Sequence, residues 1–256
     1  MLLAVDIGNT NIVVGLYDGA SLRTSWRMAT ERAKMPDEWW AVLSILAGEE
    51  AIDLRALSGS VVASVVPRLT ETFVEMIERR LGRPPVVVSA ALDLGIRVEV
   101  DNPYEVGADR LADAVAVRAR HGAPAVVVDF GTGTNFDVVS PEGAYIGGAI
   151  APGVKLALEA LTGQAARLTA VELAVPPSAI GHNTIRAVQS GTVLGYLGLV
   201  EGLLARIERE LGAKPAVIAT GGLGAIFAAH SPAIDAYEPD LTLEGLRLIF
   251  ERVAAR

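Results

Sequence analysis

Short apolar runs alternate with longer amphipathic segments along most of the chain. Runs with the length of strands occupy residues 2–6, 12–17, 21–28, 60–66, 85–89, 125–128, 136–139, 143–150 and 216–220. Apolar residues at helical spacing occupy 37–46, 69–81, 111–120, 154–161, 185–211 and 240–256. Strands that alternate with helices are typical of α/β architecture, which is the predicted fold class.

One arrangement occurs twice. In each half, an apolar strand ends in an Asp, a small polar loop follows, and a second apolar strand leads to a turn with Gly. The copies are Asp6-Ile-Gly-Asn-Thr-Asn11 and Asp129-Phe-Gly-Thr-Gly-Thr-Asn135. Aligned without a gap, Asp6 falls on Asp129 and Asn11 on Thr134, and the second copy is one residue longer to its turn. The repeat predicts a duplicated fold with two equivalent loops that face one cleft.

Such loops have the chemistry of a phosphate-binding site. Small residues let backbone N–H groups approach phosphate oxygens closely, and Asn and Thr side chains add donors. The residues of this kind are Asn9, Thr10, Asn11, Thr132 and Thr134. Phosphate repels a carboxylate, so Asp6 and Asp129 are expected to hold a cation or its water shell. A single copy would favour a plain hairpin turn, whereas the repetition favours phosphate binding.

The length and the composition suit two domains of moderate size. The chain has 256 residues, of which 51% are hydrophobic and 20% charged. His121-Gly-Ala-Pro124 interrupts the helical pattern just before the second copy of the loop. We therefore predict domains of residues 1–122 and 123–256.

Charge and cysteine content exclude several classes of protein. A net charge of −8 argues against a general nucleic-acid surface, and an aromatic content of 5% argues against base stacking. Cysteine is absent, so there is no disulfide or thiol chemistry. The first residues lack a basic leader, and the apolar runs fall short of the ~20 residues that a membrane helix needs. These features predict a cytoplasmic protein without a membrane partner.

A polar stretch between the loops, Asp101–Arg110, contains a second candidate site. Asn102 and Pro103 predict a turn, and Asp109 and Arg110 begin a long helix. From residue types alone, Asp109 is best explained as an acidic residue in a first helical turn, where it favours the helix dipole.

Two later segments leave alternatives open. Thr184 can serve as a cap near the start of a helix, and Gly221-Gly-Leu-Gly224 is either a tight turn or a surface for the base or ribose of a nucleotide. The helix over 185–211 contains Gly191, Gly195, Gly198 and Gly202. Glycine is costly in a helix, so close packing against another helix, or a dimer seam, is expected.

The motifs together resemble those of the type III pantothenate kinases, a family of the acetate kinase, sugar kinase, Hsp70 and actin superfamily. The resemblance covers nearly the whole chain and is most specific at residues 6–11, 102–110, 129–134 and 147–153. It implies a duplicated ribonuclease H-like (actin-like ATPase) fold with two mixed-sheet domains around a central cleft. It also implies ATP-dependent phosphorylation of pantothenate to 4′-phosphopantothenate, the first step of coenzyme A biosynthesis.

The resemblance assigns a role to each candidate residue. Asp109 would be the catalytic base, Asp6 would hold Mg²⁺ through water, and Asp129 would bind a monovalent cation, K⁺ or NH₄⁺. The implied nucleotide-binding residues are Asp6, Ile7, Gly8, Asn9, Thr10, Asn11, Ile12, Val13 and Thr132. The implied pantothenate-binding residues are Tyr104, Gly107, Ala108, Asp109, Arg110 and Thr184. A homodimer is also implied.

The chain departs from the family pattern in the second loop, where Gly133 replaces a common Ala and Asn135 a common Thr. An alternative function is that of a non-catalytic accessory or regulatory protein of the same family. Another kinase or phosphatase of the superfamily is a third hypothesis. The presence of Asp6, Asp109 and Asp129 favours a kinase over a mere binder, and the stretch from Gly107 to Arg110 favours pantothenate.

Overall fold

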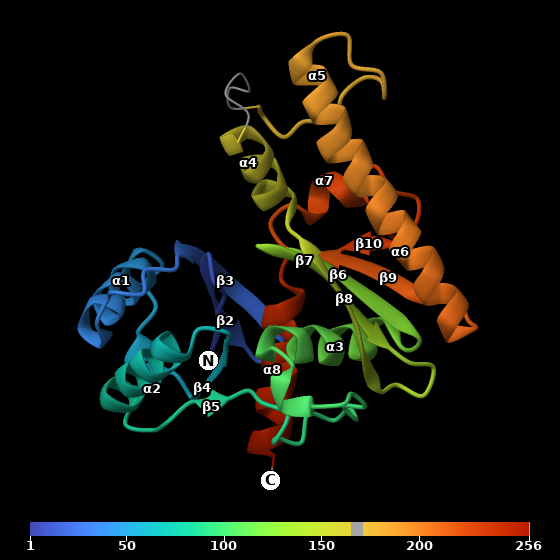
Figure 1. Ribbon diagram of the computed structural model, residues 1–256. Helices are drawn as coiled ribbons and strands as arrows, with labels where there is room; N and C mark the ends of the chain where they lie inside the picture. Colours follow the sequence, from blue (N-terminus) through green and yellow to red (C-terminus); the bar gives the residue numbers. More distant parts are fainter. Residues whose placement is uncertain (165–170, 256) are drawn as a thin grey trace. The chain divides into compact units, whose positions relative to one another are not determined.

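The computed structural model describes residues 1–164 and 171–255 (Figure 1). The chain folds into two compact units, one made of Met1–Ala119 and Leu241–Arg256, the other of Arg120–Asp240. Each unit contains a five-stranded mixed sheet covered by helices. The predicted duplicated α/β fold is therefore confirmed.

The first sheet has the strand order β3-β2-β1-β4-β5. β1 (Leu2–Ile7) pairs antiparallel with β2 (Asn11–Asp18), which pairs antiparallel with β3 (Ser21–Ala29). β4 (Gly59–Ser64) is parallel to β1, and β5 (Val86–Val87) is parallel to β4. The strand predicted over 85–89 is thus reduced to two residues.

Alternate residues of β1 point to opposite faces of this sheet, and each face has its own core. On one face, α1 (Pro36–Glu49) and α2 (Pro67–Leu81) bury Trp39 and Phe73, whose ring centroids are 5.3 Å apart. On the other face, α3 (Ala108–His121) and α8 (Leu241–Ala254) complete a second apolar cluster.

The C-terminal helix α8 belongs to the first unit, so the structure differs here from the predicted division into 1–122 and 123–256. Leu243, Leu246 and Ile249 of α8 are buried against the first sheet and α3. Gly245 lets the backbone of α8 approach that of α3, since a Cβ there would collide with the carbonyl of Ala112. A chain end can return to an earlier sheet whenever that sheet still has an uncovered apolar face.

The second sheet has the order β10-β9-β6-β7-β8. Its antiparallel strands are β6 (Ala125–Phe130), β7 (Gly133–Val139) and β8 (Tyr145–Pro152). β9 (Ala216–Thr220) is parallel to β6, and the two-residue β10 (Ala236–Tyr237) is parallel to β9.

The helices of the second unit are α4 (Val154–Gln164), α5 (Thr184–Gln189), α6 (Gly195–Leu211) and α7 (Gly224–Ala228). A π-helical segment, Ser190–Leu194, joins α5 to α6, so that they form one long helix (Figure 1). Within the described ranges, this helix alone has the length and apolarity of a membrane span, and 39% of its apolar window is buried. Its buried residues, among them Val200 and Leu204, belong to the core of the second unit.

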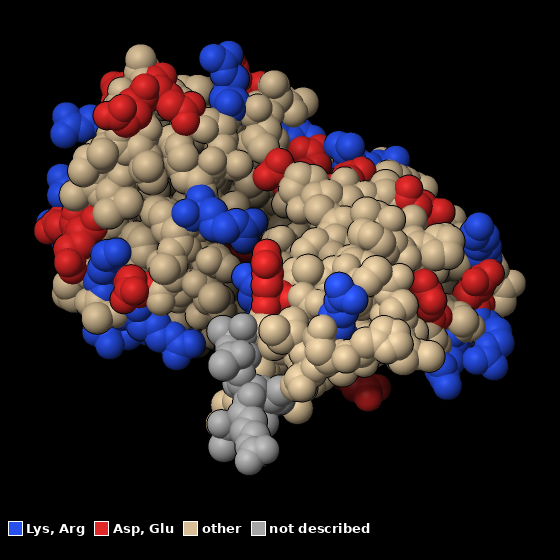
Figure 2. All heavy atoms as spheres, turned by 90° about the horizontal axis from the view of Figure 1, so that it is seen from above, with Lys and Arg blue, Asp and Glu red and all other residues tan. Residues whose placement is uncertain are grey.

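Basic and acidic side chains are interspersed on the face seen in Figure 2, with uncharged residues between them. The formal net charge of the whole chain is −8.

Candidate active site: two strand-end loops and a helix start

The first loop is the turn between β1 and β2. Asp6 is half-buried at the end of β1, and Gly8 N–H donates to the carbonyl of Asn11 over 2.9 Å. Thr30, just beyond β3, holds the loop from the side: its hydroxyl donates to the Gly8 carbonyl over 2.7 Å and its N–H to the Thr10 carbonyl over 3.0 Å. These bonds leave Asn9 and Thr10 exposed, as a ligand loop requires.

Ile7 and Ile12, which were expected to bind nucleotide, are fully buried in the first core. Only their backbone groups are available to a ligand, and the carbonyl of Ile7 already accepts the N–H of Val65 over 3.1 Å. Val13 is half-buried in β2.

Arg32 is a candidate that the sequence analysis missed. Its guanidinium donates to the side-chain oxygen of Asn9 over 3.0 Å and so places a positive charge at the exposed loop. In the sequence, Arg32 is one of several basic residues in and after β3, and only the β2–β3 pairing brings it to the loop.

The second loop has a shorter turn than the first. In the first hairpin Ile7 pairs with Ile12, which leaves residues 8–11 in the turn, whereas Phe130 pairs with Thr134, which leaves residues 131–133. The gapless alignment is therefore wrong beyond the turn, because Thr134 takes the place of Ile12, not of Asn11. The burial patterns of the following strands agree with this register.

The shift changes which residues of the second loop can reach a phosphate. Thr134 is fully buried, so its side chain does not face a ligand from the loop. Thr132 is exposed at the tip of the turn, and Asn135 is half-buried. The turn also approaches the end of β8 closely, since a Cβ on Gly153 would collide with the carbonyl of Thr132.

Asp129 lies half-buried at the end of β6, between two glycines. A Cβ on Gly131 would lie 3.2 Å from its Oδ2, and a Cβ on Gly221 would collide with its Oδ1. The segment Gly221–Gly224 is thus a strand-to-helix turn between β9 and α7 that packs against the Asp129 carboxylate.

The third component is the start of α3. Asp109 is half-buried, and its Oδ1 accepts the N–H of Arg110 over 2.9 Å. Burial raises the pKa of the Asp109 carboxyl above its ordinary value, although its hydrogen bond and charge interaction with Arg110 act in the opposite direction. Gly107 makes room for this carboxylate, because a Cβ there would collide with Asp109 Oδ1.

The structure brings the Asp6 loop and the Asp109 segment to the same edge of the first sheet. Val65 follows β4, donates its N–H to Ile7, and has its Cγ1 3.4 Å from the position of a Cβ on Gly107. Both candidate carboxylates of the first unit are therefore found where the parallel strands β1 and β4 end.

The predicted pantothenate residues differ in accessibility. Tyr104 is 76% exposed, Ala108 is buried and Arg110 is half-buried. Thr184 is exposed at the first position of α5. Asn183, not Thr184, is the capping residue, because its side-chain oxygen accepts the N–H of Arg186 over 2.9 Å.

The carboxylates suit cations that share their shell with a ligand. In the part of the chain that the structure describes, no group of three or more His, Asp or Glu side chains could hold a metal by itself. Mg²⁺ usually binds proteins through one or two carboxylates, with water and substrate phosphates as its other ligands. Asp6 and Asp129, each beside a glycine turn, fit that pattern.

Comparisons with known proteins agree on one family. The model of the type III pantothenate kinase family matches residues 2–206. A type III pantothenate kinase of Thermomicrobium roseum is 54% identical over 253 residues, which are 99% of this chain and 98% of that protein. Another, of Moorella thermoacetica, is 48% identical over 252 residues, which are 98% of this chain and 99% of that protein.

Solved structures agree on the fold. A Campylobacter jejuni protein named for the Baf family of transcriptional activators has a TM-score of 0.64 and 18% identity, covering 99% of this chain and 100% of that one. Component A of the (R)-2-hydroxyglutaryl-CoA dehydratase of Acidaminococcus fermentans has a TM-score of 0.59 and 13% identity. The match covers 99% of this chain and 98% of that one. At such identities the likeness shows the fold alone, which is that of the actin-like ATPases and sugar kinases.

Proposed function

Since the chain belongs to the type III pantothenate kinase family and phosphorylates pantothenate with ATP in coenzyme A biosynthesis, we propose that Asp109 and the two strand-end loops carry out this reaction. ATP and a divalent metal ion belong to the activity of such a kinase. Phosphoryl transfer needs a cradle for the phosphates, positive charge to offset theirs, and a group that orients the acceptor hydroxyl.

Asp109 is the proposed catalytic base. It accepts the proton of the primary hydroxyl of pantothenate as that oxygen bonds to the γ-phosphorus of ATP and the bond from this phosphorus to ADP breaks. A carboxylate is a weak base for an alcohol, so its main work is to orient the hydroxyl and to take the proton late. The single observation that supports this role best is the position of its carboxylate, over Gly107 and at the same sheet edge as the Asp6 loop.

Each of the two loops is proposed to bind nucleotide phosphate. Backbone groups from Asp6 to Val13 and the side chains of Asn9, Thr10, Asn11 and Thr132 donate to phosphate oxygens. Arg32, held at Asn9, adds a positive charge. Asp6 would hold Mg²⁺ through water, and the ion would supply positive charge against the phosphates.

Asp129 is the proposed site of a monovalent cation, K⁺ or NH₄⁺. The support is a half-buried carboxylate between Gly131 and Gly221, where neither neighbour occupies the adjacent space with a side chain. A cation there attracts nucleotide phosphate to a loop whose carboxylate would otherwise repel it.

The residues proposed to bind pantothenate are Tyr104, Gly107, Ala108 and Arg110 beside the base in the first unit, and Thr184 in the second unit. Ala108 is buried and takes part through its backbone, whereas Tyr104 offers an exposed ring and Arg110 a charge. Thr184 is exposed, and Asn183 rather than Thr184 caps the helix.

We also propose a cytoplasmic homodimer that associates through the long helix. Gly191, Gly195 and Gly198 are exposed, and a Cβ on any of them would meet nothing within 4 Å. Nearby, Ile180 is 75% and Ile185 is 53% exposed. A glycine stripe beside exposed isoleucines is suited to the close approach of a second helix.

The activity is tested by ADP release from ATP and Mg²⁺, with and without pantothenate, first in K⁺ and then in Na⁺ buffer. We expect release that requires both pantothenate and K⁺. Pantothenate-dependent release of equal rate in Na⁺ would contradict the cation site. No pantothenate-dependent release from folded protein would favour the accessory-protein function.

A further inference from the structure

The Asp129 carboxylate lies directly against Gly221. Gly221 has φ of +82°, in the left-handed region, and a side chain there would collide with Asp129 Oδ1 and with the carbonyl of Phe130. Glycine has the largest conformational freedom of all residues, so the close approach requires bonds that fix its peptide group.

Tyr237 supplies such a bond. Its hydroxyl donates to the carbonyl oxygen of Gly221 over 3.1 Å, and the N–H of Gly224 donates to the same oxygen over 3.1 Å. The tyrosine ring lies against the other end of the turn, since a Cβ on Gly224 would be 2.6 Å from its Cε2. Tyr237 therefore contacts the Gly221–Gly224 turn at both ends.

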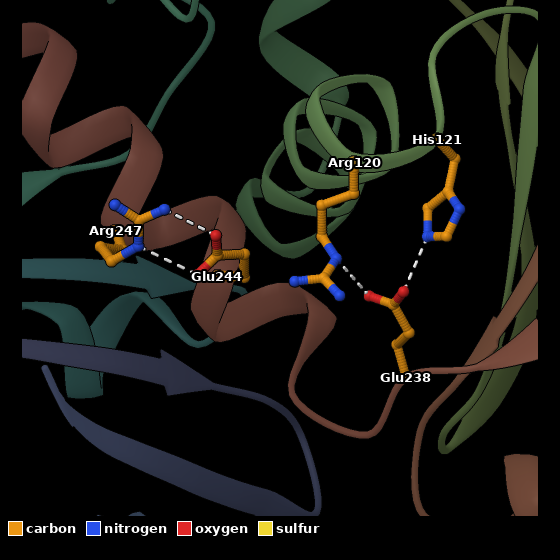
Figure 3. Close-up of polar contacts among 5 residues, drawn as sticks. All are labelled: Arg120, His121, Glu238, Glu244 and Arg247. Carbon is orange, nitrogen blue, oxygen red and sulfur yellow. Dashed lines mark hydrogen bonds and ion pairs between the residues drawn. The ribbon is translucent and has the colours of Figure 1, made fainter. Parts of the chain in front are cut away.

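Tyr237 is held in turn by the residue that follows it. β10 has only two residues, of which Tyr237 pairs with Ala219 of β9. The carboxylate of Glu238 binds Arg120 Nε over 2.8 Å and His121 Nε2 over 2.7 Å, as Figure 3 shows. The backbone N–H of Glu238 also donates to Ala219 of β9 over 2.9 Å.

We infer that Tyr237 is a positioning residue for the kinase reaction. Its hydroxyl holds the Gly221 turn against the carboxylate of Asp129 and thereby fixes the direction in which that carboxylate presents its oxygens to a cation and a nucleotide. This role rests on the proposed function of Asp129. Tyr237 itself touches neither reacting atom.

The test is the variant Tyr237→Phe, which removes the hydroxyl and keeps the ring against Gly224. Loss of one hydrogen bond predicts an increase of about three- to tenfold in the Kd of ADP in K⁺ buffer, measured by calorimetry without pantothenate. We expect the same increase in the KM for ATP, and no change in the KM for pantothenate. A merely structural hydrogen bond would move none of these ligand-binding constants.

Tyr145→Phe is the matched control. It removes a bond of similar length in the same unit, from Tyr145 to Asp137 Oδ1 over 3.0 Å, and this bond is not part of the turn. We expect a lower Tm and an unchanged Kd of ADP. An equal loss of ADP affinity in both variants would overturn the inference, because the effect would then follow from lost stability.

Gly221→Ala tests the contact between this glycine and Asp129 directly. Its Cβ displaces the Asp129 carboxylate, so we expect a larger loss of ADP affinity than in Tyr237→Phe. Asp129→Asn distinguishes the proposed role of Asp129 from that of Tyr237. Weak ADP binding in Asp129→Asn with normal binding in Tyr237→Phe and Gly221→Ala would overturn the role of Tyr237 alone. Normal binding in Asp129→Asn would overturn the role of Asp129 and, with it, that of Tyr237.

Discussion

At the scale of the residue, the surroundings of Asp109 disfavour the ionised form of its carboxyl group. Its carboxylate is half-buried over Gly107, and burial raises its pKa above the ordinary value of 3.8. A catalytic base gains reactivity from such a raised pKa, while the folded protein loses stability by burying the charge.

The cost of burying the Asp109 carboxylate depends on pH. Between its ordinary pKa and its raised pKa, the folded state binds the proton more tightly than the unfolded state, so the free energy of unfolding falls as pH rises through this window. Asp109→Asn removes the titrating group. We expect its Tm to exceed that of the wild type at pH 7, and the difference to shrink as pH approaches 4. A difference that grows on acidification would contradict a raised pKa.

The same shift predicts the acidic limb of the rate profile. Asp109 must be ionised to accept a proton, so kcat/KM should fall on acidification with a midpoint above 3.8. Rates measured in a single buffer series at constant ionic strength check this midpoint. A profile that stays flat down to pH 4 in protein that remains folded would exclude Asp109 as the titrating base.

Arg32 offers a second prediction at this scale. Arg32→Ala removes the positive charge beside Asn9 and should raise the KM for ATP about ten- to 150-fold, since a hydrogen bond to a charged group contributes about 1.5–3 kcal/mol. Arg23→Ala is the control, because Arg23 is an exposed arginine of β3. Equal KM values for the two variants would show that Arg32 does not contact the nucleotide.

At the scale of the element, the sequence predicts the long strands and helices, whose apolar residues repeat at a regular spacing. It does not predict the shortest elements. Long strands and helices such as β2 and α2 were expected nearly at their observed bounds, because alternating or helical apolar spacing follows directly from the sheet and core that they face. α7 and β10 have too few residues for any period to be visible.

Other errors arose from geometry that no residue type encodes. The length of the second turn decides whether Thr134 matches Asn11 or Ile12, and only the strand register shows that it matches Ile12. The start of α1 was placed at Asp37, whereas Met35 occupies the cap position and Pro36 begins the helix. Proline suits the first helical position because it has no N–H to satisfy.

The close contact of α8 with α3 predicts opposite effects of alanine at two helical glycines, Gly245 in α8 and Gly48 in α1. Gly48→Ala in α1 should raise the free energy of unfolding by up to about 1 kcal/mol, since its Cβ meets nothing within 4 Å. Gly245→Ala should lower it, because the Cβ would collide with Ala112. Denaturant unfolding of both variants measures the two signs. A stabilising effect of Gly245→Ala would contradict the close contact of α8 with α3.

At the scale of the whole molecule, the function was predicted from the family resemblance and not from the composition. Charge and cysteine content excluded classes of protein, but only the motifs around Asp6, Asp109 and Asp129 indicated a kinase, and the relatives at 54% and 48% identity establish the family. The residues proposed for its site are distributed over both units, with Asp6 and Asp109 in one and Asp129 and Thr184 in the other.

The proposed dimer gives a prediction at this scale. Gly198 is exposed in the glycine stripe of the long helix, so Gly198→Arg should block the approach of a second helix without affecting the core of its own unit. Sedimentation should then show monomers where the wild type is dimeric. A wild type that sediments as a monomer at micromolar concentration would contradict the proposal.

The central claim is that Asp109 is the catalytic base of a pantothenate kinase, and the turnover of Asp109→Asn at saturating ATP and pantothenate tests it most directly. Asparagine keeps the size of the side chain but cannot accept the proton. The predicted result is a fall in kcat of about 10²–10⁴, with ATP affinity close to that of the wild type. Unchanged turnover would contradict the account and remove Asp109 from the mechanism.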